Sequence, residues 1–282
     1  MSKRVFAVLV MFALSICLIG ANASTKNIRS VPISVSVNNQ FVAVEDASFN
    51  YNGVAYGPVR AIAESMGADS ITWDSRTSSA RINCDNKSIE VTNDSSIIYV
   101  DSKAKNVTYP AVLNNDKLSM PIGIIVDMMG GQCNWEGATM HMQIYKKGCT
   151  VPNQHKYNRG YTEDDVVWLS KIINAESSGE SLTGKIAVGN VVLNRVQSAE
   201  YPNTIYGVIF DKNHGVQFEP VINGSIYNTP SYDSVLAAKM ALEGTTHAGD
   251  SLFFCNPVTS TNSWIMNNRP FYSMIGNHAF FL

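Results

Sequence analysis

The stretch at residues 162–179, TEDDVVWLSKIINAESSG, decides how the second half of the chain folds. Thr162 and Asp165 have the spacing of a capping box, in which each side chain bonds to a backbone N–H group of the first helical turn. Apolar residues then recur at helical spacing, at Val166, Leu169, Ile172 and Ile173. Glu176 lies on the same face, and Ser177-Ser178-Gly179 then ends the helix. The pattern therefore predicts an amphipathic helix with one carboxyl group on its apolar face.

A carboxyl group on an apolar helix face needs an explanation. Removal from water disfavours the charged form, so Glu176 would keep its proton to higher pH, as a general acid at neutral pH requires. The alternative is a structural glutamate that is satisfied by an arginine or by backbone donors. The helix end beside Glu176 would open a cleft at its side chain, which suits the catalytic interpretation.

The residues after this helix predict a mainly helical domain with a polar groove. Helices are expected at residues 182–196 and 231–243, and an aromatic strand at 251–257. The loop at 211–230 is rich in Asn, Gly and Pro, and long loops of this kind are usually functional. Aromatic faces, amides and one imidazole, at His278, gather in these segments. They are the groups that a sugar site uses.

The first half of the chain contains an internal repeat. Residues 57–68, GPVRAIAESMGA, return as residues 120–131, MPIGIIVDMMGG, and a tryptophan follows each copy, at Trp73 and Trp135. Each copy predicts a short helix that starts at a proline and ends at a glycine, followed by two strands. Leading strands are expected at 33–44 and 96–109, which gives an α+β module of two β-α-β-β units. Both indoles are expected to pack in the core, with sugar stacking as the alternative.

Residues 1–23 have the pattern of a signal peptide. Lys3 and Arg4 precede an apolar run at residues 5–19, and Ala21-Asn22-Ala23 has the small-x-small pattern of a cleavage site. The run is shorter than the roughly 20 residues of a spanning helix, although an uncleaved anchor is the alternative. We therefore expect an exported protein without stable membrane insertion after cleavage.

The mature chain would keep four cysteines, at positions 84, 133, 149 and 255. An even number in an exported protein permits disulfides in three connectivities, Cys133–Cys149 among them, and free thiols are the alternative. The spacing fits no zinc motif.

Composition excludes two classes of protein. With 282 residues, 45% hydrophobic content and a net charge of −2, the chain is long enough for two domains and is neither a disordered chain nor a basic nucleic-acid binder. A segment without apolar period at 148–161 predicts a linker between domains at 32–147 and 162–282. The first part, counted from residue 24 to 161, carries a net charge of +1 and the second carries −5.

Residues 32–147 resemble the two-repeat domain called copper amine oxidase N-terminal-like. The matching segments are 58–73, 121–135 and Tyr109-Pro110-Ala111-Val112-Leu113-Asn114. In that family the copper belongs to a separate catalytic domain, so the resemblance implies an extracellular accessory domain without a metal.

The second half resembles the cell-wall hydrolases of the spore cortex-lytic SleB and CwlJ type. Six ordered motifs carry the resemblance: residues 173–180 (INAESSGE), 192–196 (VLNRV), 201–205 (YPNTI), Gln217-Phe218, 253–257 (FFCNP) and 275–280 (IGNHAF). The resemblance implies a reduced lysozyme-like fold in which Glu176 is the only catalytic acid. Cys255 departs from the family pattern, which has an aromatic residue or His at this position.

The resemblance also implies the reaction. A lytic transglycosylase needs one carboxyl group, which protonates the bond between N-acetylmuramic acid and N-acetylglucosamine and then deprotonates the 6-hydroxyl of the same muramyl sugar. Phe218, Phe254 and Trp264 are expected to stack on sugars, Gln217 and Asn256 to bind their polar groups, and His278 to orient a loop. The expected partner is the glycan strand of peptidoglycan in the cell wall or spore envelope, and no cofactor is expected.

Three alternatives remain open at the level of sequence. A hydrolase with two carboxylates would need Glu180 or Glu219 as the second group. An amidase that cuts the muramoyl-alanine bond would need zinc, for which His214, His247 and His278 lack paired spacing. A wall-binding protein without activity, or an adhesin whose N-terminal module does the main work, would need neither.

Overall fold

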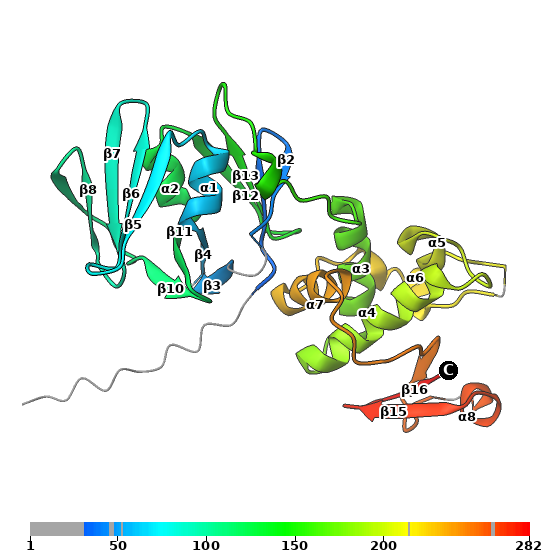
Figure 1. Cartoon of the computed structure of the whole chain (residues 1–282). Coiled ribbons are helices and arrows are strands. Elements are labelled where there is room, and N and C mark those ends of the chain that lie inside the picture. Colours follow the sequence, from blue (N-terminus) through cyan, green and yellow to red (C-terminus); the bar gives the residue numbers. More distant parts are fainter. Residues whose placement is uncertain (1–30, 45–47, 52, 214, 261–262) are drawn as a thin grey trace, which may run out of the picture.

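The computed structural model of the chain describes residues 31–44, 48–51, 53–213, 215–260 and 263–282 (Figure 1). A strand-rich part, coloured blue to green, lies beside a mainly helical part, coloured green to orange, and a small sheet near the C-terminus is red. The structure is therefore α+β with two parts. The predicted signal peptide at 1–23 lies outside the described residues. No helix within the described ranges has the length and apolar character needed to cross a membrane.

The strand-rich part holds thirteen of the described strands and two short helices. They are β1 (Ser34–Val37), β2 (Gln40–Val42), β3 (Phe49–Tyr51), β4 (Val54–Pro58), α1 (Val59–Ser65), β5 (Ser70–Asp74), β6 (Ser79–Cys84), β7 (Lys87–Thr92), β8 (Ile97–Val100), β9 (Lys103–Asn106), β10 (Val112–Asn114), β11 (Lys117–Pro121), α2 (Ile122–Met128), β12 (Gln132–Glu136) and β13 (His141–Tyr145). The strands form three sheets, in the orders β12-β13-β1-β2, β10-β11-β4-β3 and β5-β6-β7-β8-β9. Strand β1 pairs with β13 in parallel, which joins the start of this part to its end.

Helices α1 and α2 lie where the sequence predicts them. Pro58 and Pro121 precede their first residues with φ of −65° and −50°, close to the value that a helix start requires. Ile62 and Ile125 of these helices, and Met66 and Met129 directly after them, are 0–2% exposed and belong to one core cluster. The apolar residues lie four positions apart in each copy, so they share one face, and this face is the buried one.

The predicted leading strands are wrong in detail, because each segment folds into a hairpin. Asn38 and Asn39 have φ of 49° and 69° and turn the chain between β1 and β2. Asp101 and Ser102, with φ of 50° and 64°, do the same between β8 and β9. Two consecutive residues with positive φ form the tight turn that matches the twist of antiparallel strands, and Asn and Asp tolerate it well.

The prediction that Trp73 and Trp135 are core residues is also wrong. Their side chains are 43% and 40% exposed. Trp73 lies on β5 and Trp135 on β12, and both strands are at the edge of their sheets. An edge strand has a neighbour on one side only, so a large side chain on it can remain at the surface.

The second part contains the remaining helices and the last three strands. They are η1 (Asn153–His155), α3 (Glu163–Ser177), α4 (Leu182–Gln197), α5 (Ile205–Ile209), α6 (Glu219–Asn223), η2 (Ser225–Tyr227), α7 (Tyr232–Leu242), β14 (Phe253–Cys255), α8 (Trp264–Asn268), β15 (Phe271–Ile275) and β16 (His278–Phe281). Helices α3, α4 and α7 pack against one another, and β14-β16-β15 form a sheet. At the start of α3, both bonds of the Thr162–Asp165 capping box are present.

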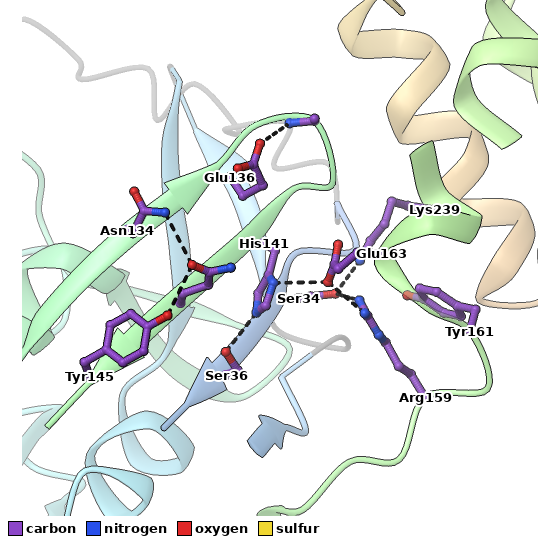
Figure 2. Close-up of polar contacts among 12 residues, drawn as sticks. Ser34, Ser36, Asn134, Glu136, His141, Tyr145, Arg159, Tyr161, Glu163 and Lys239 are labelled. Carbon is purple, nitrogen blue, oxygen red and sulfur yellow. Dashed lines mark hydrogen bonds and ion pairs between the residues drawn. The ribbon is translucent and has the colours of Figure 1, made fainter. Parts of the chain in front are cut away.

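The two parts meet in a polar contact between strands β1 and β13 of the first part and the start of α3 (Figure 2). Glu163 forms ion pairs with His141 Nδ1 at 3.1 Å and with Arg159 Nη2 at 2.7 Å. His141 Nε2 also bonds to Ser36 Oγ at 2.9 Å. The Arg159 side chain is only 5% exposed, and its guanidinium lies 4.0 Å from the ring centroid of Phe41. The segment predicted as a linker is thus packed into the junction.

A buried lysine completes this junction. Lys239 of α7 is fully buried, and its Nζ donates to Ser34 Oγ of β1 (Figure 2). Tyr161 lies between the two parts, and its hydroxyl donates to Glu243 Oε1 while the Tyr157 hydroxyl donates to Glu243 Oε2 at 2.8 Å. Charged groups at low exposure are costly unless they are paired, so these contacts hold the two parts in one arrangement.

All four described cysteines are free thiols. The Cys133–Cys149 bridge that the sequence permits is not formed. Cys149 instead lies with its Sγ 3.0 Å from the Met66 carbonyl oxygen, and Cys133 is exposed on β12.

Candidate active site

Glu176 lies in the last turn of α3 at the wall of a cavity of about 850 Å³. The other walls come from α4, the loop before α6, β14, α8 and β16, so the cavity gathers residues that are far apart in the sequence. A volume of this size is within the usual range for ligand-binding clefts. The helix that carries Glu176 is anchored by its buried apolar stripe, at Val166, Leu169, Ile172 and Ile173.

The surroundings of Glu176 favour its protonated form. Burial and then the negative charge of Glu219 raise the pKa of Glu176 to about 7, and the positive charge of Arg195 opposes this effect only in part. Among the described residues, no Lys, Arg or His nitrogen lies within 4.0 Å of a Glu176 oxygen. The alternative of a structural glutamate held in an ion pair therefore does not apply to this side chain.

Arg195 is a cavity residue that the sequence reasoning missed. Its side chain is buried, and its Nε donates to the Leu252 carbonyl oxygen at 2.8 Å. The guanidinium lies over the rings of Tyr201 and Phe218, at 5.0 and 5.2 Å from their centroids. Its Nη1 has no hydrogen-bond partner among the described residues. Burial lowers the pKa of Arg195, but an arginine remains charged near neutral pH. Its place in the motif VLNRV was the available signal.

All six residues predicted to contact substrate line this cavity: Gln217, Phe218, Phe254, Asn256, Trp264 and His278. They differ in how much surface they offer. Trp264 is 49% exposed at the first turn of α8, which suits an aromatic stacking surface. Phe218 is only 2% exposed and packs under Arg195, so its ring supports the wall and offers little surface for stacking.

His278 and Phe254 form one wall of the cavity. Their rings meet edge to face with centroids 5.4 Å apart, and Phe254 also stacks on Phe280 at 6.0 Å. His278 is 9% exposed, and burial lowers its pKa although the nearby Glu180 charge acts in the opposite direction. The neutral imidazole is therefore favoured. In this form one ring nitrogen can donate a hydrogen bond and the other can accept one. The sequence had suggested a role in orienting a loop.

The structure separates the two candidate second carboxylates. Glu219 is the first residue of α6, lines the cavity and is exposed. Glu180 is not among the lining residues, because it bonds to the turn between β15 and β16: its Oε1 accepts from Asn277 Nδ2 at 2.8 Å and its Oε2 from the Asn277 backbone N–H at 3.2 Å. Burial would raise the pKa of Glu180, but these bonds outweigh it and the pKa is lowered.

Arg269 is a further cavity residue that the sequence did not single out, and it lies near Asn256 and Cys255 in the lining. Arg269 places its guanidinium 4.3 Å from the ring centroid of Phe253 and 5.4 Å from that of Trp264, and it braces the exposed indole. Asn256 accepts at Oδ1 from the Val258 backbone N–H at 2.9 Å, which fixes the turn after β14. Cys255 lines the cavity as well.

No group of three His, Cys, Asp or Glu residues in the described part of the chain is arranged to hold a metal ion. His278 lines the cavity, His247 is exposed elsewhere, and His214 lies outside the described residues.

Two family models match the chain. Residues 179–281 match the cell wall hydrolase family, and residues 36–144 match the copper amine oxidase N-terminal domain. The chain therefore carries a cell wall hydrolase domain, with a domain of the copper amine oxidase N-terminal type in front of it.

The cell wall hydrolase domain is homologous to spore cortex-lytic enzymes. The enzyme of that name from Bacillus cereus is 40% identical over 134 residues, which are 48% of this chain and 48% of the relative. The enzyme from Bacillus subtilis is 34% identical over 121 residues, which are 43% of this chain and 38% of the relative. The chain thus matches about half the length of these curated relatives or less.

A solved structure matches the same region. The catalytic domain of the germination-specific lytic transglycosylase SleB from Bacillus anthracis is 38% identical, with a TM-score of 0.41, and the match covers 45% of this chain and all of that domain.

Proposed function

We propose that this protein degrades peptidoglycan by cleaving the bond between N-acetylmuramic acid and N-acetylglucosamine as a lytic transglycosylase. The observation that carries the proposal is Glu176, a carboxyl group with a pKa of about 7 at the wall of a large open cavity. A group with this pKa is substantially protonated near neutral pH and can also act as a base after it has given up its proton. The homology with spore cortex-lytic enzymes supports this substrate.

The proposed reaction uses Glu176 twice. Its carboxyl proton moves to the glycosidic oxygen as the bond from that oxygen to the muramyl C1 breaks, and positive charge develops at C1. The 6-hydroxyl oxygen of the same sugar then bonds to C1, and its proton returns to the Glu176 carboxylate. The products are a 1,6-anhydromuramyl end and a free 4-hydroxyl on the departing N-acetylglucosamine. The internal hydroxyl is effective because it is already close to C1.

The neighbours of Glu176 fit its two roles. Burial and Glu219 keep the acid protonated before the reaction, and the Arg195 charge stabilises the carboxylate that forms afterwards. Trp264 provides the exposed aromatic face on which a sugar ring can stack. Gln217 and Asn256 provide amides for acetamido and hydroxyl groups, and Phe254 and His278 form the opposite wall.

Hydrolysis is the second candidate, because Glu219 also lines the cavity and its charge reaches Glu176. In that reaction Glu219 would activate a water molecule, and the product would have a reducing end. The two candidates make different demands on Glu219, since a transglycosylase does not need it as a base.

We further propose where the protein acts. The signal peptide at 1–23 would export it, and the domains at 32–147 and 162–282 would then act on the cell wall or spore envelope, with spore cortex as the substrate during germination. Peptidoglycan glycan strands are the expected partner.

The experiment is digestion of purified cortex and vegetative sacculi, with products identified by mass spectrometry. Anhydro-muropeptides, one water lighter than the hydrolytic products, would support transglycosylation, whereas reducing ends would support hydrolysis and free stem peptides an amidase.

Glu176→Gln should lower the rate by about 100-fold or more while the protein stays folded. Glu200→Gln, which changes an exposed carboxyl group of the same cavity, is the matched control and should keep its activity. Full activity of the Glu176→Gln variant would refute the proposal.

A further inference from the structure

The strand-rich part has a groove of its own, with a volume of about 470 Å³. It lies between α1, strand β5, the turn that joins β10 to β11, and η1 of the connecting segment. No residue of the cavity around Glu176 lines it. The groove is therefore a separate candidate binding site.

The floor of this groove is aliphatic and its rim is polar. Ala61, Ala80 and Leu118 are buried beneath it, and Leu113 and Trp73 are 42% and 43% exposed at its edge. Small aliphatic side chains leave shallow hollows that suit methyl groups, and an exposed indole offers a flat face for a peptide unit or an aliphatic chain.

The rim carries charges of both signs. Asp116 is exposed in the turn between β10 and β11, and Lys117 is exposed at the start of β11. Neither forms an ion pair with another residue in the described ranges. Arg60 of α1 uses one nitrogen on Glu64 Oε1, at 3.1 Å, and its side chain stays 52% exposed. A guanidinium has five N–H donors, so Arg60 keeps donors for a ligand carboxylate.

The far end of the groove is held in place by the connecting segment. His155 Nε2 lies 2.6 Å from Glu64 Oε2, and the His155 backbone oxygen accepts from the Ala43 N–H at 2.8 Å. The Glu64 carboxylate thus contacts both Arg60 and His155, one with each oxygen. Burial would raise the pKa of Glu64, but these two partners lower it, so the carboxylate stays charged and fixes both side chains. The groove is preorganised in the free protein.

We propose that this groove binds the stem peptide of peptidoglycan. A stem peptide has small alanine methyl groups, free carboxylates and the amino group of a diamino acid. The aliphatic floor matches the methyl groups, Lys117 and Arg60 match the carboxylates, and Asp116 matches the amino group. The choice of this peptide among short acidic peptides rests on the proposed function of the other domain.

The lining favours a peptide over a glycan strand. A sugar chain presents hydroxyl groups along its edges, which need neutral hydrogen-bonding partners. Among the lining residues Gln154 is the one amide, whereas nine are apolar: Ala43, Pro58, Val59, Ala61, Ile71, Trp73, Ala80, Leu113 and Leu118. A glycan would leave most of its hydroxyl groups without partners over this floor.

The test is calorimetric titration of the full mature chain carrying Glu176→Gln. The probes are the synthetic peptide L-Ala-γ-D-Glu-meso-diaminopimelate-D-Ala-D-Ala, the same peptide with its carboxyl groups amidated, and an N-acetylglucosamine tetramer. The free peptide should bind, and amidation should weaken binding about tenfold or more because the charged hydrogen bonds are lost. Binding of the sugar tetramer that is weakened by Trp73→Ala, or no binding of the peptide, would overturn the proposal.

The chain offers a matched pair of variants. Trp73→Ala should weaken peptide binding about tenfold, whereas Trp135→Ala should leave it unchanged, because Trp135 is equally exposed on the corresponding strand but does not line the groove. Lys117→Glu reverses an exposed charge at the rim of the groove and should weaken binding by a similar factor. Equal effects of the two tryptophan variants would refute the site.

These outcomes are independent of the catalytic proposal. Loss of sacculus digestion with intact peptide binding would refute the proposed reaction alone. Digestion of soluble glycan fragments should be unchanged in Trp73→Ala, whereas digestion of intact sacculi, where anchoring matters, should slow. If peptide binding is absent while digestion is normal, the groove proposal alone fails.

Discussion

Glu176 shows how one side chain acquires a catalytic pKa from its neighbours. The helix places the carboxyl group at the edge of the apolar core, and burial is the largest cause of its raised pKa. Glu219 adds a negative charge from the start of α6, 43 positions away in the sequence, while Arg195 limits the rise in pKa. An acid that gives up its proton and takes it back needs this balance, because a pKa far from the working pH would disable one of the two steps.

This balance predicts the effect of Glu219→Gln. Removing the negative charge lowers the pKa of Glu176, so the acid loses its proton at lower pH. The alkaline limb of the pH–rate profile should move to lower pH, and activity at pH 8 should fall about two- to threefold while activity at pH 5.5 is kept. The measurement is the initial rate of sacculus digestion against pH.

Glu200→Gln provides the comparison. Glu200 lines the same cavity, but the charges that act on Glu176 are those of Glu219 and Arg195. Its profile should match that of the unchanged protein. A complete loss of activity in Glu219→Gln at all pH values would instead identify Glu219 as the base of a hydrolytic reaction.

At the scale of elements, the turn between β15 and β16 is tied to the end of α3. Gly276 has φ of 59°, and the following Asn277 makes two bonds to Glu180, which lies just beyond α3. A Cβ atom at position 276 would lie 1.9 Å from Glu180 Oε2, so the carboxylate occupies the space that a side chain would need. The turn leads directly to His278, so this contact places one wall of the cavity.

Gly276→Ala should therefore break the contact. We expect a loss of about 2 kcal/mol in the free energy of unfolding, together with lower activity, because φ is positive and the Glu180 carboxylate must move away from its two bonds to Asn277. The comparison is Gly130→Ala, where φ is 69° but nothing lies within 4 Å of the added Cβ, and where about 1 kcal/mol is expected. Urea unfolding measures both. Equal losses would mean that the Glu180 contact contributes nothing.

At the scale of the whole molecule, α3 connects the junction of the two parts to the cavity around Glu176. Glu163 begins the helix at the junction and Glu176 lies 13 positions later, about 20 Å along the axis. Burial would raise the pKa of Glu163, but contacts with His141, Thr139 and Arg159 outweigh it and lower the pKa to about 2. The carboxylate therefore stays charged and holds the buried Arg159 guanidinium.

Glu163→Gln should destabilise the junction in a pH-dependent way. Since the pKa of Glu163 is below its ordinary value of 4.5, its contribution is complete above about pH 4.5 and is lost as the pH falls towards 2. We expect a loss of about 1–3 kcal/mol at pH 7, allowing for the 35% exposure of the side chain, and a smaller difference from the unchanged protein at pH 3. Thermal unfolding at the two pH values measures it.

An exposed ion pair provides the control. Glu90 pairs with Arg81 at 2.7 Å on the surface of the five-stranded sheet. Glu90→Gln should cost less than about 1 kcal/mol, because water and salt screen such a pair. If Glu163→Gln costs no more than this control, the junction is not held by its charges.

The sequence by itself determined the helices α1, α2 and α3 and the place of Glu176 on α3. The capping box at Thr162 is a motif of four consecutive residues. The helical period places Glu176 on the apolar stripe of α3, and this period depends only on neighbours along the chain. The prolines before α1 and α2 and the glycines after them likewise mark the ends of these helices locally.

The tertiary structure alone decided which distant groups meet. It put Trp73 and Trp135 on edge strands, brought Glu219 but not Glu180 to the cavity, and placed Arg195 beside the acid. These placements depend on the order of the strands in each sheet and on the paths of the loops. They cannot be predicted from the periodicity of the sequence. A pKa likewise depends on all charges within several ångströms, and in a folded chain those charges come from segments that lie far apart in sequence.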